Sequence, residues 1–158
     1  GEVMGIDKDF GLAYAKSQIS SGNSLPTKGL AFISLKDKHK NEGIDLAKKL
    51  VELNFTLCGT EGTANAIQKN GIKCKKINKV SGGSPHIVDV LNAKKIALVI
   101  NTGGGKRAYR ILDSTSLRRA TLINKVPYCT NMSTAYACLE GIKSLKSKKI
   151  TVTSLQDI

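Results

Sequence analysis

Two threonines, Thr60 and Thr63, stand among glycines in the segment TLCGTEGTANAI (56–67), where a strand-like run breaks into a turn before a helical pattern. Glycines allow close approach of the backbone to a ligand, and the free amides at the start of a helix attract anions. Alternatively, Thr60 caps the helix that begins near Gly62, and Thr63 fills its first turn. The segment therefore predicts either a small phosphate cradle or an ordinary helix start.

Two lysines, Lys40 and Lys79, could supply positive charge to the same anion. Lys40 stands at the start of a predicted helix, where a cation opposes the helix dipole unless an anion lies between them. Lys79 follows an alternating strand and precedes a glycine turn, which by itself favours a solvated surface charge. The glycine-rich segment TGGGKR (102–107) lacks the spacing of a Walker A loop, so ATP hydrolysis is not indicated.

The other candidates for chemistry are two histidines and four cysteines. His39 and His86 are far apart in sequence and show no catalytic arrangement with Ser, Cys or Asp, so structural or surface roles are expected. The cysteines lack a Cys-x-x-Cys pair and a nearby His at metal-ligand spacing. They are expected to be small buried hydrophobes in a reducing compartment. They are Cys58, Cys74, Cys129 and Cys138.

The composition favours anionic partners. The 158 residues carry a formal net charge of +13, yet there is no Trp, aromatic residues make up 4%, and Lys and Arg are spread along the chain. Because base stacking needs aromatic faces, a basic nucleic-acid-binding module is an alternative rather than the first interpretation. No apolar run reaches membrane-spanning length, and no signal peptide is evident. Gly1 is not a natural start, so we expect a piece of a longer chain.

The elements that must position these residues alternate in type. After a helical pattern at about 9–19, strand patterns alternate with helical ones, which predicts an α/β fold with a doubly wound, mainly parallel sheet of five or six strands flanked by helices. Strands are predicted at 29–35, 55–60, 72–78, 96–102, 126–130 and 150–155, and helices at 41–53, 63–70, 86–93, 116–125 and 133–145. Ligands bind at the carboxyl ends of such strands, which here carry many hydroxyls, amides, glycines and cations. A polar pocket for an anion is therefore expected there.

Six segments resemble, in their order and spacing, the carboxy-terminal end of the large chain of glutamine-hydrolysing carbamoyl-phosphate synthase: GEVMGID, GTEGTA, INKV, PHIVD, LVINT and LRRA. The resemblance covers essentially the whole chain. It implies that residues 1–28 are a connector from the end of the preceding ATP-grasp synthetase unit. Residues 29–158 would form a methylglyoxal-synthase-like allosteric domain.

The resemblance also implies a regulatory role, because in that family this domain performs no chemistry and binds effectors. These are commonly a pyrimidine nucleotide monophosphate as inhibitor and a purine nucleotide or ornithine as activator. Residue matching implies effector contacts from Ser34, Lys40, Thr60, Thr63, Lys79 and Asn101. It implies no catalytic residue, metal ligand or cofactor in this fragment.

The partners implied are a UMP- or IMP-type nucleotide, the remainder of the large subunit and the small glutaminase subunit. No membrane partner is implied, and nucleic acid is not the expected ligand. The full-length enzyme would be an oligomer in the cytoplasm. It would make carbamoyl phosphate from bicarbonate, glutamine-derived ammonia and ATP, with Mg or Mn, for pyrimidine and arginine biosynthesis.

Two departures from the family pattern affect the expected ligands. The chain reads Asn-Thr-Gly at 101–103, where the bacterial pattern often has Asn-Thr-Thr or Asn-Thr-Pro, which removes a hydroxyl that can contact the nucleotide. It reads Tyr128-Cys129-Thr130 where ornithine-responsive members have Tyr-Asp-Thr. Tyr128 and Thr130 would then be remnants of an ornithine site, and ornithine is expected to bind weakly or not at all.

A stand-alone methylglyoxal synthase-like lyase is the enzymatic alternative. Ser84 stands where the catalytic aspartate of that family follows a Gly-Gly pair, and the family's later Pro-His-Asp segment has no counterpart around 111–114. No carboxylate base is then evident for enolisation of a triose phosphate. The cyclohydrolase half of the bifunctional purine-synthesis enzyme shares the sheet but lacks GEVMGID and the LVINT and LRRA arrangement.

Overall fold

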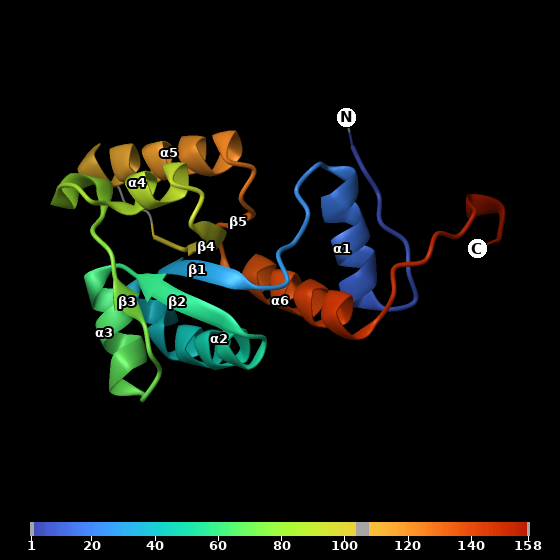
Figure 1. Cartoon of the computed structure of the whole chain (residues 1–158), viewed down its shortest axis with the longest axis horizontal. Coiled ribbons are helices and arrows are strands. Elements are labelled where there is room, and N and C mark those ends of the chain that lie inside the picture. The colour runs from blue at the N-terminus through green and yellow to red at the C-terminus, as the bar shows by residue number, and fades with distance from the viewer. Residues whose placement is uncertain (1, 104–107, 158) are drawn as a thin grey trace.

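A five-stranded parallel sheet forms the centre of the protein (Figure 1). The computed structural model describes residues 2–103 and 108–157. The strand order is β3-β2-β1-β4-β5, so the chain reverses its direction across the sheet between β1 and β4. The predicted doubly wound α/β fold is thereby confirmed. The strands are β1 (Gly29–Ser34), β2 (Phe55–Gly59), β3 (Lys75–Lys76), β4 (Ile96–Asn101) and β5 (Tyr128–Cys129).

Helices cover both faces of the sheet, because successive strand residues point to opposite sides. Ile33 and Ile100 join one apolar cluster, whereas their neighbours Phe32 and Val99 join the other. The first cluster lies under α2, α3 and α6, and the second lies under α4 and α5 (Figure 1). The helices are α2 (Lys40–Glu52), α3 (Glu61–Lys69), α4 (Ile87–Asn92), α5 (Ala108–Ile123) and α6 (Met132–Ser147).

The amino-terminal helix α1 (Phe10–Ser20) packs against α6, away from the sheet (Figure 1). Asp9 caps α1 by accepting from the Leu12 N–H at 2.9 Å, and its carboxylate also accepts from Ser144 Oγ and Lys148 Nζ of the α6 end. These bonds, that from Lys148 first, hold the pKa of Asp9 well below its usual range. The helix predicted at 9–19 is confirmed, and the boundary between connector and domain at residue 28 stays a prediction.

The predicted strand at 150–155 is wrong. This segment lies outside the sheet and is exposed, with Val152 at 97% exposure, and it ends in a short 3-10 helix at Leu155–Asp157. Helix α5 begins at Ala108, earlier than the predicted position 116, and residues 104–107 of the predicted glycine loop lie outside the described residues. All four cysteines are buried free thiols, as predicted. Within the described residues, no helix has the length and apolar character needed to cross a membrane.

Candidate functional site

Two hollows lie side by side at the carboxyl ends of β1, β2 and β4, where the fold predicts a ligand. Hollow A has a volume of about 330 Å³ and is lined by Phe32, Ser34, Val80, Ile87, Asn101 and Leu117, among others. Hollow B has a volume of about 400 Å³ and is lined by Lys40, Glu61, Gly62, Thr63 and Asn78, among others. Leu35, Asp37, Thr60 and Lys79 line both. The six residues predicted to contact an effector therefore all line one continuous site.

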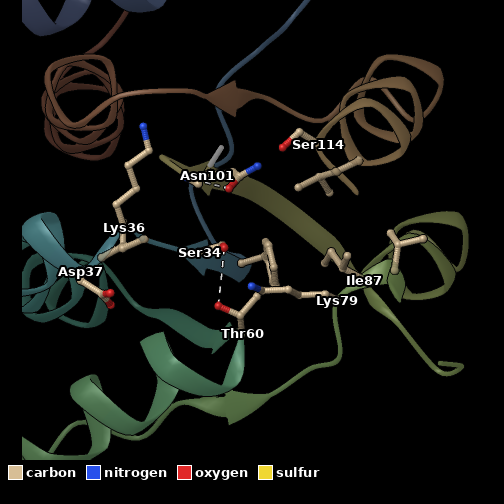
Figure 2. A pocket seen from close by; sticks show the side chains of 13 residues that line it. Ser34, Lys36, Asp37, Thr60, Lys79, Ile87, Asn101 and Ser114 are labelled. Carbon is tan, nitrogen blue, oxygen red and sulfur yellow. Dashed lines mark hydrogen bonds between the residues drawn. The ribbon is translucent and has the colours of Figure 1, made fainter. Parts of the chain in front are cut away.

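The hydroxyls of Ser34, Thr60 and Thr63 form a cluster between β1 and the start of α3. The Thr60 hydroxyl lies 3.3 Å from Thr63 Oγ1 and 3.5 Å from Ser34 Oγ, a contact that is drawn in Figure 2. Thr63 is 1% exposed, and its Oγ1 accepts a hydrogen bond from the Leu35 N–H at 3.0 Å. Thr63 thus holds the end of β1 against α3, and it also lines hollow B.

The start of α3 has no side-chain cap. Thr60 occupies the N-cap position with extended backbone angles (φ −61°, ψ 152°), but its hydroxyl makes no capping hydrogen bond. The alternative in which Thr60 caps the helix is therefore confirmed in position, since Thr60 is the N-cap residue and Thr63 lies in the first turn, but Thr60 supplies no side-chain capping bond. Because the first amides of a helix have no intrahelical partner, the N–H groups of the first turn remain able to bind an anion in hollow B.

Two ammonium groups flank these amides. Lys40 Nζ pairs with Asp37 Oδ1 at 2.6 Å, and it lies so close to α3 that a Cβ atom on Gly62 would be 3.5 Å from it. Lys79 precedes the short 3-10 helix Val80–Gly82 and is exposed, and its side chain points toward Thr60 (Figure 2). The site thus places positive charge on both sides of the uncapped helix start, as a phosphate group requires.

Asn101 ends β4 and is held in a fixed orientation. Its Oδ1 accepts from the Gly103 N–H at 3.0 Å, and its Nδ2 donates to the Tyr128 hydroxyl at 3.0 Å. The side chain is 6% exposed and lines hollow A. Tyr128 therefore supports the site through Asn101, whereas Thr130 is exposed and lines neither hollow.

Cys129 stands between these two residues and is 1% exposed. Its Sγ lies 3.3 Å from Cys138 Sγ, and this contact together with burial raises the pKa of the Cys129 thiol far above its usual value. The thiol is therefore neutral at physiological pH and offers no charge to an ammonium group.

Three parts of the site were missed in the sequence. The apolar floor of hollow A comes from single residues of four different elements, which no local pattern indicates: Phe32, Val80, Ile87 and Leu117. Thr102 is 3% exposed, and its Oγ1 contacts both the Lys36 N–H and His39 Nδ1. Asp37 adds a carboxylate to both hollows. The position of Thr102 directly after a buried strand was the signal available for it.

Ser84 does not belong to either hollow. It is exposed, and its hydroxyl donates to Asp89 Oδ2 at 2.9 Å in the loop before α4. The same carboxylate oxygen accepts from the His86 N–H at 2.8 Å. Ser84 thus has a structural partner at the start of α4.

The doubly wound sheet and the site at its carboxyl ends define an α/β domain suited to binding a small anionic ligand. Residues 42–130 match the family model of the MGS-like domain, and the chain belongs to this family. It is also similar, over nearly its full length, to the carboxy-terminal section of carbamoyl phosphate synthase large chains. The resemblance found in the sequence is therefore confirmed.

Two relatives show the extent of this similarity. The carbamoyl phosphate synthase large chain of Mesorhizobium japonicum is 45% identical over 157 residues, which cover 99% of this chain and 13% of the relative. The carbamoyl phosphate synthase large chain, C-terminal section, of Methanopyrus kandleri is 46% identical over 159 residues, which cover 100% of this chain and 29% of the relative. The chain thus spans less than a third of either relative.

Among solved structures, the crystal structure of methylglyoxal synthase from Elizabethkingia anophelis NUHP1 superimposes with a TM-score of 0.56 at 17% identity. The match covers 73% of this chain and 79% of that one. At this level of identity the likeness shows a shared fold.

Proposed function

We propose that this chain is the effector-binding part of a carbamoyl-phosphate synthase large chain and that it binds a nucleoside monophosphate of the UMP or IMP type. The observation that carries the proposal is the uncapped start of α3 between Lys40 and Lys79. The similarity to the carboxy-terminal section of named carbamoyl phosphate synthase large chains supports it.

The effector phosphate occupies hollow B in this proposal. The first-turn amides of α3 and the hydroxyl of Thr63 donate hydrogen bonds to it, and the ammonium groups of Lys40 and Lys79 neutralise it. The hydroxyl of Thr60 lies on the boundary between the hollows. Hydrogen bonds to charged groups are stronger than neutral ones, so most of the affinity resides here.

The base and ribose occupy hollow A. Its apolar floor suits the faces of a base, while Ser34 and Asn101 present a hydroxyl and an amide to the polar atoms. Its volume of about 330 Å³ falls within the range of small-molecule pockets. Hollow A combines apolar and polar lining residues, and hollow B adjoins the start of α3 with Lys40 and Lys79, which together suit a nucleotide better than a free phosphate or a nucleoside.

The wider role follows from the relatives and is part of the proposal. The full protein makes carbamoyl phosphate from bicarbonate, glutamine-derived ammonia and ATP in the cytoplasm, for pyrimidine and arginine biosynthesis. ATP and Mg or Mn act in synthetase units outside this chain, alongside a small glutaminase subunit in an oligomer. Ornithine acts weakly or not at all, because the neutral Cys129 thiol cannot replace a carboxylate.

Calorimetric titration of UMP and of IMP into the protein tests the proposal. Replacement Lys79→Ala is expected to lower nucleotide affinity by about 1.5 to 3 kcal/mol, the range for a charge-assisted hydrogen bond, and the loss should shrink as salt rises. Lys76→Ala is the matched control, because this exposed lysine of β3 lines neither hollow. Equal nucleotide affinities in the wild type and Lys79→Ala would show that Lys79 is a solvated surface charge that does not contact the ligand.

Two further assays separate the alternatives. Incubation with dihydroxyacetone phosphate should yield no methylglyoxal, since Ser84 lies outside the hollows. Turnover that is abolished by Asp37→Asn or by Ser84→Ala would instead support a lyase.

Titration with a single-stranded oligonucleotide at moderate salt should give weaker binding than UMP or IMP. The reverse order would favour a nucleic-acid-binding module.

A further inference from the structure

We infer that His39 is a positioning residue of the effector site: Thr102 holds its imidazole, and this contact sets the place of the Lys40 ammonium at the start of α3. The inference rests on the proposed function, because Lys40 matters only if hollow B binds a phosphate. His39 itself lines neither hollow. Its effect on a ligand must therefore act through other residues.

The hydroxyl of Thr102 contacts both ends of the turn between β1 and α2, at Lys36 and at His39. Thr102 Oγ1 accepts from the Lys36 N–H at 3.2 Å and lies 3.0 Å from His39 Nδ1. Within the turn, the His39 N–H donates to the Lys36 carbonyl at 2.9 Å. Thr102 is itself fixed to β1, since its N–H donates to the Ser34 carbonyl at 3.0 Å.

The contact with Thr102 limits the imidazole to two hydrogen-bonded arrangements. The Thr102 oxygen already accepts from Lys36, and its proton has His39 Nδ1 as the acceptor within hydrogen-bond distance among the described contacts. A hydroxyl donates one proton, and a neutral imidazole accepts at one nitrogen and carries its proton on the other. With the proton on Nε2, Thr102 donates to Nδ1; with the proton on Nδ1, the imidazole donates to the second lone pair of Thr102 Oγ1.

Lys40 directly follows His39 and begins α2. The Lys40 ammonium lies beside Gly62, where the helix dipole of α3 repels it. The side chain of its ion-pair partner Asp37 is 94% exposed. An exposed ion pair holds a side chain weakly. The turn held by Thr102 and His39 therefore acts together with the packing of α2 to keep the backbone of Lys40 opposite the start of α3.

Calorimetric titration of UMP into variants of these residues tests the inference. His39→Ala should lower affinity about five- to tenfold, the effect of about one net hydrogen bond. His39→Asn keeps an acceptor oxygen near the position of Nδ1 and should restore most of the loss. Thr102→Val should match His39→Ala, whereas Thr102→Ser retains the hydroxyl and should bind like the wild type. Lys38→Ala is the control within the same turn, because Lys38 is exposed and lines neither hollow.

A double-mutant cycle separates positioning from a general loss of structure. If His39 acts through Lys40, His39→Ala should have almost no further effect on UMP affinity in a Lys40→Ala background. It should keep its full effect in a Lys79→Ala background, because Lys79 comes from a different loop. Equal losses in both backgrounds would overturn the inference.

Nitrogen-15 NMR of the imidazole tests the contact without any nucleotide. The wild type should show a preference for one tautomer, and Thr102→Val should abolish this preference. A wild type that binds neither UMP nor IMP would overturn the proposed function and this inference with it. A wild type that binds UMP with the same affinity as His39→Ala would overturn the inference alone.

Discussion

The ammonium nitrogen of Lys40 lies beside the first turn of α3, where a Cβ atom on Gly62 would be 3.5 Å from it. The start of a helix carries partial positive charge, so a cation at this place is repelled by the helix dipole. Asp37, which pairs with Lys40 at 2.6 Å, offsets part of this repulsion. A phosphate between Lys40 and the amides would convert the repulsion into two attractions.

Replacement of Lys40 should therefore separate binding from stability. We expect Lys40→Gln to weaken UMP binding by about 1.5 to 3 kcal/mol through the lost charged hydrogen bond. Without an anion, the same variant should keep or raise the free energy of unfolding by about 0.3 to 1 kcal/mol, because the clash with the dipole is removed. Calorimetry and urea unfolding in a phosphate-free buffer measure the two effects.

Lys38→Gln is the control for that experiment, since it removes a charge from the same turn outside the hollows. It should leave both UMP affinity and stability nearly unchanged. A Lys40→Gln variant that is clearly destabilised without an anion would show that Lys40 is a structural cation.

Thr63 should affect folding as well as binding, which distinguishes it from Lys79. Its Oγ1 accepts from the Leu35 N–H at 3.0 Å, and the residue is 1% exposed. Thr63→Val keeps the shape but leaves this buried N–H without its partner, so the free energy of unfolding should fall by about 1 to 3 kcal/mol. Thr63→Ser retains the oxygen and should recover most of this loss. Urea unfolding of both variants measures it, and equal stability of Thr63→Val and the wild type would contradict the assigned contact.

The fold could be predicted from the sequence where periodicity and burial agree. The core strands β1, β2 and β4 are continuous apolar runs, and each was placed within about two residues of its observed end. The segment 150–155 alternates apolar and polar residues, which also predicts a strand, but a pattern cannot say whether a neighbouring strand edge is within reach. Val152 is 97% exposed, so no strand from the described part of the chain covers it.

The site could be predicted in part, because the carboxyl ends of parallel strands meet wherever the fold is right. This rule brought Ser34, Thr60 and Asn101 together. His39 was interpreted as a surface or structural residue, since its partner Thr102 lies 63 positions away and no local signal links them. Contacts of this kind depend on how two loops face each other, which composition and periodicity do not encode.

Stability should decline at alkaline pH through the buried thiols. Burial raises the pKa of Cys58 to about 12 from the ordinary value of 9.0. Above pH 9 the unfolded chain loses this proton while the folded chain keeps it, so the free energy of unfolding falls as pH rises from about 9 to 12, at up to about 1.4 kcal/mol per pH unit. Urea unfolding under reducing conditions at several pH values should show a shallower decline in Cys58→Ala. Identical slopes would contradict the burial of this thiol.

Gly11 lies at the contact between α1 and α6, where there is little room for a side chain. A Cβ atom at this position would lie 2.3 Å from Ser144 Oγ and 2.5 Å from the Glu140 carbonyl of α6. Ser144 also donates to Asp9, the cap of α1, at 2.6 Å. Because α1 packs against α6, Gly11→Ala should lower the free energy of unfolding by about 1 to 3 kcal/mol, the usual cost of overpacking.

The sign of that change is diagnostic, because alanine is the better helix former by about 1 kcal/mol. If α1 were a free connector, Gly11→Ala would stabilise the helix or leave the domain unchanged. Ser20→Ala, at an exposed position of the same helix, serves as the control and should change stability by less than about 0.5 kcal/mol. Hydrogen exchange of the α1 amides provides the local readout. Faster exchange in Gly11→Ala than in Ser20→Ala would show that α1 is part of the folded domain. Slower exchange would show that residues 1–28 form a connector that is not packed into the domain.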